Sequence, residues 1–113
     1  MRITNVEAIE LRLPEVTQDV DGTQDDLIVR VDTDAGISGY GEVDSSPCVA
    51  RAVIEANPSH GISHGLRELL LDADPILIEQ LWQMMYEKTI YHGRSGPVLH
   101  AMSGIDLSLW DIA

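Results

Sequence analysis

The stretch from Gly93 to Ala113 constrains the fold most, because it predicts a long helix whose apolar face needs a partner. Pro97 suits the first turn of a helix, where a missing N–H costs nothing, and Ser95 is the expected N-cap. Apolar residues then recur at helical spacing along one face: Val98, Met102, Ile105, Leu109 and Ile112. That face is widened by three more: Leu99, Trp110 and Ala113.

The end of this predicted helix carries no closing signal. No Gly, Asn or Pro ends it, and Asp111 places negative charge where the helix dipole disfavours it. We therefore expect the chain to be part of a larger protein. If nothing covers Leu99, Trp110 and Ala113, we expect the chain to self-associate or bind hydrophobic dyes.

The first 43 residues predict three strands joined as an antiparallel meander. Residues 3–13 alternate, with Ile9, Leu11 and Leu13 on one face; Val6 and Ala8 fall in the opposite phase, which predicts a bulge near Ala8–Ile9. Residues 27–33 and 37–43 form the other two strands, joined by a tight turn at 34–36. In the third strand Gly39 and Gly41 share one face, which indicates that another element packs closely there.

Three more helices are predicted between the strands and the last helix. The first has Ser46 as N-cap and Pro47 at its first position, and its expected buried face is Val49, Val53 and Ala56. The second is marked by Ile62, Leu66, Leu69 and Leu70. The third is capped by Asp74, with a buried stripe of Ile78, Leu81, Trp82 and Met85. Strands followed by helices give an α+β fold, a three-stranded antiparallel meander followed by a helical bundle.

The charge and the cysteine count exclude several classes of partner. A net charge of −12 argues against nucleic acid and anionic membranes, because both require a basic patch. Cys48 is the only cysteine, so no internal disulfide can form, which fits a reducing compartment. No apolar run is long enough to span a membrane, and the N-terminus does not resemble a signal peptide. We expect a cytoplasmic protein.

One motif resembles a serine nucleophile. Residues 61–65 fit the pattern G-x-S-x-G, with Ser63 at its centre. That motif works at a turn from a strand into a helix, and residues 57–60 do not predict a strand. A helix cap is therefore the favoured interpretation of Ser63, and a small serine hydrolase stays the less favoured one.

The candidate metal ligands are incomplete. His60 and His64 have the i, i+4 spacing of a zinc pair, but a third ligand is missing. Four acids, Asp19, Asp21, Asp25 and Asp26, fail the EF-hand pattern, so a solvated acidic loop is favoured. We predict no metal site and no catalytic residue in this chain.

Two further stretches are candidate ligand contacts. Arg94 precedes the last helix and could meet an anion there, although pairing with a carboxylate is the favoured interpretation. Residues 14–26 join two strands through a polar segment much longer than a hairpin loop, and such length indicates a functional or mobile loop.

Three stretches together resemble one known family. Residues 31–42, VDTDAGISGYGE, are similar to the second hairpin of the N-terminal capping domain of the enolase superfamily, in its mandelate racemase and muconate lactonising enzyme branch. Residues 101–112, AMSGIDLSLWDI, resemble the segment that leads from this cap toward a (β/α)8 barrel. Asp74–Tyr86 resembles the helix between them. The resemblance covers nearly all of residues 1–113, with 94–113 leading toward a barrel that this chain lacks.

The resemblance implies a cap that closes over the barrel of a Mg²⁺-dependent enzyme. In that family barrel carboxylates bind the metal, and a barrel Lys or His removes the proton α to a carboxylate, so the implied ligand is a small carboxylate substrate. None of those catalytic residues or metal ligands lies in this chain. Two cap loops contact the substrate, and by position they correspond to residues 15–26 and 44–48. The implied contacts are Asp19, Asp21, Thr23, Ser45 and Ser46, with turn and capping roles as the alternative.

The function that follows is that of a capping and specificity domain of an acid-sugar dehydratase or a racemase. The expected partners are a C-terminal barrel domain and further copies in a homo-oligomer. The alternative is a freestanding binding or dimerisation module that uses the last helix.

Overall fold

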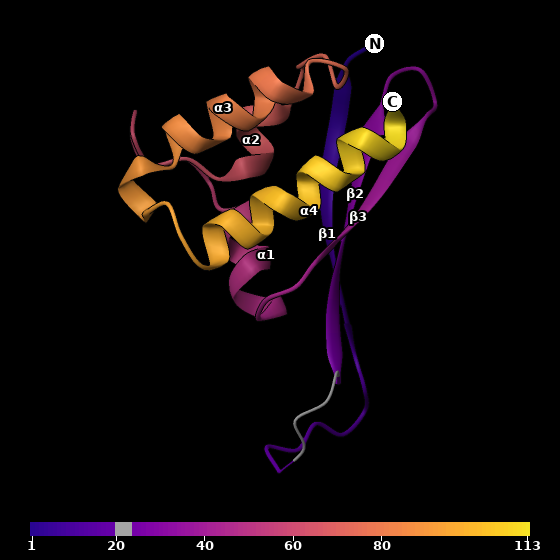
Figure 1. Cartoon of the computed structure of the whole chain (residues 1–113), viewed down its shortest axis with the longest axis vertical. Helices are drawn as coiled ribbons and strands as arrows, with labels where there is room; N and C mark the ends of the chain where they lie inside the picture. Colours follow the sequence, from indigo (N-terminus) through magenta and orange to yellow (C-terminus); the bar gives the residue numbers. More distant parts are fainter. Residues whose placement is uncertain (20–23) are drawn as a thin grey trace.

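The structure is a computed structural model that describes residues 1–19 and 24–113. Asp21 and Thr23 lie outside the described residues, so the structure says nothing about either predicted contact. Three strands come first in the chain, followed by the helices (Figure 1). The elements are β1 (Ile3–Arg12), β2 (Asp25–Thr33), β3 (Ser38–Val43), α1 (Pro47–Glu55), α2 (Leu66–Leu70), α3 (Ile78–Lys88), the 3-10 helix η1 (Ile90–His92) and α4 (Pro97–Ile112).

The strands form one antiparallel sheet in the order β1-β2-β3, which confirms the predicted meander and the α+β class. The alternation predicted for β2 is confirmed, because every second side chain is buried: Leu27, Val29, Val31 and Thr33. Gly36 supplies a positive φ of 77° in the turn between β2 and β3.

The predicted phase of β1 is wrong in its outer half. Val6 and Ala8 face the core, whereas Leu11 and Leu13 are 51% and 54% exposed. The register shift lies between Ile3 and Asn5, not at Ala8–Ile9. The reason is that the end of β1 extends beyond the helical layer, so its apolar residues there have no core to enter.

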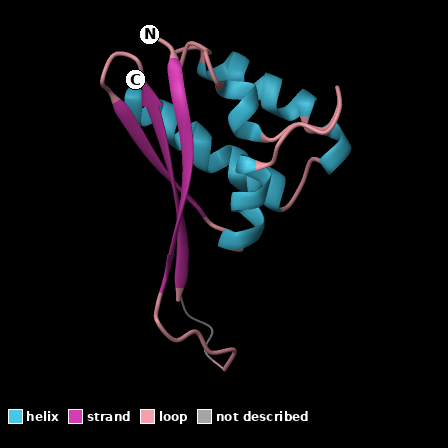
Figure 2. Ribbon diagram, turned by 180° about the vertical axis from the view of Figure 1, so that it is seen from behind, coloured by secondary structure: helices cyan, strands magenta, loops and turns pink. Residues whose placement is uncertain are grey.

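All four α-helices cover one face of the sheet, and the other face stays open (Figures 1 and 2). The core lies between the two layers, receives side chains from all three strands and all four α-helices, and takes its largest share from α4. Its largest fully buried side chains include Leu27, Ile54, Leu66, Leu70, Met85, Met102, Ile105 and Leu109. Burying such side chains contributes roughly 1.5–3 kcal/mol each before the entropy of ordering them is subtracted.

The closest contact between the layers joins β3 to α4 through glycines. A Cβ atom on Gly39 or Gly41 would clash with the carbonyl oxygen of Ser108 or Gly104, respectively. This confirms that another element packs against the glycine face of β3. The buried hydroxyl of Ser108 also donates to the Val29 carbonyl at 3.2 Å, which ties α4 to the central strand.

Asp111, near the end of α4, has a structural partner on the sheet. Its carboxylate accepts a hydrogen bond from the backbone N–H of Tyr40 at 2.9 Å. Tyr40 lies on β3, which is an edge strand, so this bond occupies one of the otherwise unpaired donors of that edge. The Asp111 carboxylate is therefore unfavourable for the helix dipole but satisfies a backbone donor of β3.

Several predicted helix starts are wrong by a few residues. α4 begins at Pro97, one residue later than an N-cap at Ser95 would place it, because its N-cap is Gly96 with a φ of 59°. α3 begins at Ile78, because Asp74 instead closes a turn by accepting the Ile76 N–H at 3.0 Å.

The predicted faces of the first two helices also need correction. α1 does begin at Pro47 after Ser46, but its buried residues are Pro47, Ala50 and Ile54, not Val49, Val53 and Ala56. α2 is confined to Leu66–Leu70, and Ile62 is 53% exposed in the turn before it.

Candidate functional site

Two loops leave the sheet at the same end. β1 ends there, β2 begins there and β3 ends there, because the three strands are antiparallel. Residues 13–24 join β1 to β2, and residues 44–46 join β3 to α1. The two loops that the family resemblance singled out therefore share one end of the molecule, and the link of 44–46 is short.

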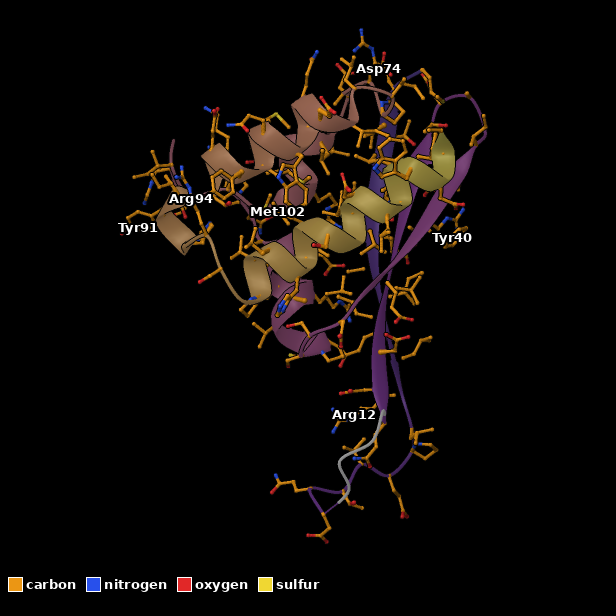
Figure 3. All side chains as sticks on the ribbon, in the orientation of Figure 1. Arg12, Tyr40, Asp74, Tyr91, Arg94 and Met102 are labelled. Atoms are coloured by element: carbon orange, nitrogen blue, oxygen red, sulfur yellow. The ribbon has the colours of Figure 1, made fainter. Side chains whose placement is uncertain are left out.

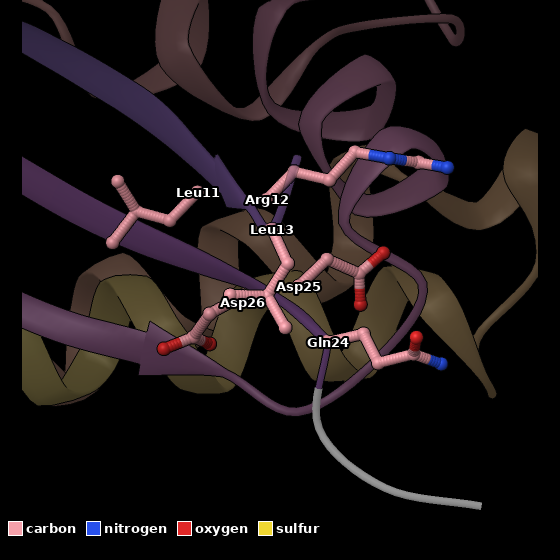
Figure 4. A pocket seen from close by; sticks show the side chains of 6 residues that line it. All are labelled: Leu11, Arg12, Leu13, Gln24, Asp25 and Asp26. Carbon is pink, nitrogen blue, oxygen red and sulfur yellow. The ribbon is translucent and has the colours of Figure 1, made fainter. Parts of the chain in front are cut away.

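The β1–β2 hairpin extends beyond β3. Arg12 pairs with Asp25, whereas β3 reaches only to the pairing of Val43 with Leu27. The extension carries a groove of about 260 Å³ lined by Leu11, Arg12, Leu13, Gln24, Asp25 and Asp26 (Figure 4). Arg12 lies at this end, far from Asp74 at the opposite end of the molecule (Figure 3).

Gln24 closes the base of the long loop. Its side-chain amide donates to the Thr17 carbonyl at 2.8 Å and accepts from the Thr17 N–H at 2.9 Å, and its own carbonyl accepts from Leu13 N–H. Neither Gln24 nor Arg12 was predicted as a site residue. The only sequence signal for these two residues is that they lie near the two ends of the polar segment between β1 and β2.

The described candidates are accessible but are not brought together. Asp19 is exposed, Ser46 is exposed and Ser45 is half-buried. Ser46 occupies the N-cap position of α1, yet its hydroxyl makes no capping bond; its carbonyl accepts the Ala50 N–H at 3.0 Å. No hydrogen bond among the described residues joins Asp19 to either serine.

Acidic residues dominate the electrostatics of this end. A hydrogen bond with Asp26 raises the pKa of Glu42, and Asp44 adds to the effect. Arg51 of α1 approaches Glu10 of β1 at 3.9 Å and Glu55 at 3.2 Å, so a cation links the base of the hairpin to α1. The carboxylates, the amide, the hydroxyls and the guanidinium of Arg12 can bind a polar ligand through hydrogen bonds.

The other sequence candidates have local partners. Ser63 lies in a tight turn with His60, and Gly65 is the N-cap of α2, so the helix-cap interpretation is wrong. No strand directly precedes Ser63, so the strand-to-helix turn on which the nucleophile motif depends does not occur at this position. His64 contacts the Glu68 carboxylate and the Gly61 carbonyl, and the Glu68 contact raises the pKa of His64.

Arg94 also differs from its favoured interpretation. Its guanidinium lies over the Tyr86 ring, 4.5 Å from the ring centre, and forms no ion pair with a carboxylate of residues 1–19 or 24–113. Such a contact of a cation with an aromatic face is stabilising at an exposed site by roughly 0.5–1 kcal/mol. Arg94 therefore fastens the segment before α4 to α3.

A metal ion does not fit the residues that the structure describes. Within 1–19 and 24–113, no three His, Cys, Asp or Glu side chains gather closely enough to hold a metal ion. The part of the chain described here also contains no helix long and apolar enough to cross a membrane.

The chain resembles known proteins over nearly its whole length. Residues 4–113 match the family model described as the mandelate racemase / muconate lactonizing enzyme, N-terminal domain. The D-galactonate dehydratase of Ralstonia pickettii is 39% identical over 89 residues, which are 76% of this chain and 20% of that enzyme. The chain thus spans about a fifth of the length of the curated relatives it matches.

Solved structures agree with this match. A predicted mandelate racemase from Rhodobacter sphaeroides superposes with a TM-score of 0.81 and 31% identity, covering 98% of this chain and 28% of that one. A racemase from Streptomyces coelicolor with bound magnesium has a TM-score of 0.73 and 29% identity, covering 97% of this chain and 31% of that one. The chain therefore belongs to the mandelate racemase / muconate lactonizing enzyme family of the enolase superfamily, and it corresponds to the N-terminal domain of that family.

Proposed function

We propose that this chain is the capping and specificity domain of a Mg²⁺-dependent enzyme that removes the proton α to the carboxylate of an acid sugar. The observation that carries the proposal is the match of residues 4–113 to an N-terminal domain of this family. The position of both cap loops at one end of the sheet supports it. Catalysis belongs to a C-terminal (β/α)8 barrel, which supplies the metal ligands and the base.

Within this proposal the cap binds and encloses the substrate and performs no proton transfer. The described residues at the loop end offer hydrogen-bonding groups, and they include no nucleophile with an adjacent base. Closing a polar loop over a substrate excludes water and selects among substrates. The contacts we assign to this role are Asp19, Asp21, Thr23, Ser45 and Ser46.

Dehydration of a sugar acid is the favoured reaction. The curated relatives at 38–39% identity are D-galactonate dehydratases. Polar groups at the loop end also suit a polyhydroxylated carboxylate. Racemisation is the second candidate, because the Streptomyces coelicolor neighbour is a racemase. The products distinguish the two reactions, because a dehydratase eliminates water from its substrate, whereas a racemase inverts the configuration of a carbon without eliminating water.

The test is a fusion of residues 1–113 to the C-terminal part of the Ralstonia pickettii dehydratase, assayed with galactonate and Mg²⁺. Replacing Asp19 or Ser45 by Ala should lower kcat/KM about tenfold, mainly through KM, because one polar contact to substrate is lost. Glu87→Ala, at an exposed position of α3, is the control and should leave both constants unchanged. Equal constants for all variants would contradict the assigned contacts.

We also propose that the complete enzyme is cytoplasmic and forms a homo-oligomer. Native mass spectrometry of the full-length protein tests the oligomeric state. The alternative, a freestanding binding or dimerisation module, predicts an intact natural chain of 12.4 kDa. A reversible dimer of that natural chain, with no larger product of the reading frame, would favour the alternative.

A further inference from the structure

A second surface lies at the other end of the molecule, between α3 and α4. The two helices pack side by side, and the C-terminus lies at the end of α4 (Figure 1). The groove between them has a volume of about 410 Å³ and is lined by Ile78, Glu79, Trp82, Gln83, Asp106 and Trp110. An adjoining groove of about 370 Å³ shares Ile78, Glu79 and Trp110 and reaches Ala113.

This surface exposes several large apolar side chains. Trp110 is 60% exposed, and Ile76 and Leu77 beside it are 51% and 43% exposed. Contiguous exposed apolar side chains rimmed by polar ones mark interaction sites. Trp is also the residue type most enriched among the anchors of protein interfaces.

The charged groups that line the groove are both acidic, and Gln83 adds a neutral amide. Asp106 lines the groove from α4, the helix that carries Trp110, and Glu79 lines it from α3, the helix that carries Trp82. Burial raises the pKa of Asp106, against a smaller opposing effect of Trp110. Among the described residues, neither carboxylate takes part in an ion pair. A groove lined by two indoles and two carboxylates suits an Arg or Lys side chain, because indoles can make cation–π contacts and carboxylates can accept charge-assisted hydrogen bonds.

A second copy of this chain is a poor occupant. Its net charge is −12, and a symmetric contact would bring the same carboxylates together. The relatives indicate a different occupant, since the match covers only 20% of the dehydratase and 28–31% of the solved neighbours. In a protein of that length, residues following position 113 start beside Trp110, because Ala113 lines the adjoining groove.

We propose that the α3–α4 groove is the docking surface for the C-terminal domain, which inserts an Arg or Lys side chain between Trp82 and Trp110. The inference rests on the two-domain enzyme of the proposed function. It assigns the groove to holding the domains together, at the end opposite the substrate-facing loops. Apolar residues of the docked segment cover Ile76 and Leu77.

The test is hydroxyl-radical footprinting of the same fusion, with the isolated chain as reference. Burying an indole that is now 60% exposed should lower the labelling of Trp110 about fivefold. Equal labelling of Trp110 in the folded fusion and in the isolated chain would overturn the proposal. If the fusion is insoluble, residues 1–113 and the C-terminal part are co-expressed as separate chains, and failure of one to capture the other overturns it.

Charge reversal tests the basic occupant. Glu79→Arg should restore the labelling of Trp110 or abolish capture, whereas Glu87→Arg, on the same helix and outside the groove lining, should do neither. Trp110→Ala should abolish capture of the separately expressed C-terminal part. Leu107→Ala is its matched apolar control and should leave capture unchanged, because Leu107 is 53% exposed on α4 and does not line the groove. If Glu79→Arg leaves Trp110 protected, a basic side chain is not the occupant.

Activity of the fusion separates this inference from the proposed function. Protection of Trp110 without dehydratase or racemase activity would refute the proposed function and leave the docking surface in place. Activity without protection would refute the docking surface alone.

Discussion

Gly41→Ala should disrupt the contact between the sheet and α4. The new methyl group would clash with the Gly104 carbonyl oxygen and would lie 2.9 Å from Ser108 Oγ and 3.0 Å from Leu107 Cβ. The first obstacle is backbone, so no rotamer change relieves it. α4 must move away from β3, or β3 must bend outward.

The size of the effect follows from this geometry. Overpacking a core costs typically 1–3 kcal/mol, and a backbone obstacle places Gly41→Ala near the upper value, about 3 kcal/mol. A domain of this size is stable by roughly 5–15 kcal/mol, so the loss is a large fraction of the total. The Tm should fall by about 13 °C, because the unfolding entropy of a chain of 113 residues is about 0.24 kcal/mol/K.

Urea denaturation followed by tryptophan fluorescence measures the loss, with Gly61→Ala as the control. Gly61 has nothing within 4 Å of its added Cβ and no positive φ, so its variant should be neutral or slightly stabilising. If Gly41→Ala lowers the free energy of unfolding by less than about 1 kcal/mol relative to Gly61→Ala, the close approach of α4 to β3 is wrong.

Two further predictions concern the helices. Glu68 raises the pKa of His64 in the folded chain, so protonated His64 stabilises the fold at pH values below its ordinary pKa of about 6.5. This contribution is lost as the pH rises through the pKa of His64 in the folded chain. NMR titration should show the raised pKa and Glu68→Gln should lower it, whereas an unchanged pKa in the variant would show that the contact does not form. Leu109→Ala should cost about 2–5 kcal/mol because Leu109 is fully buried, while Leu107→Ala on the exposed side of α4 should cost under about 0.5 kcal/mol; similar losses in chemical denaturation would mean that the helix is rotated.

The sequence was most informative where a pattern is local and has one interpretation. The alternation of β2 and the glycines of β3 predicted the central strand and the close approach of another element. Pro47 and Pro97 located the starts of α1 and α4. Each of these signals depends on neighbouring residues alone, so the rest of the fold could not alter it.

The errors arose where distant parts of the chain decide the outcome. Leu11 alternates like a core residue, but it lies on a hairpin extension that no helix covers. Asp74 has the features of an N-cap, yet a turn through Pro75 intervenes before α3. The family resemblance singled out two loops, which the structure places at one end of the sheet, but nothing in the sequence predicted that Gln24 would close one of them through Thr17.

The hairpin extension has a consequence for how such a domain changes over evolutionary time. Its outer residues, such as Leu11 and Leu13, make no contribution to the core, and the helical layer does not cover them. Under the proposed function, substitutions there would act on ligand choice with little effect on folding, since surface positions tolerate change at small cost. One cap can therefore acquire new specificities through its loop while selection on stability acts on a separate set of residues.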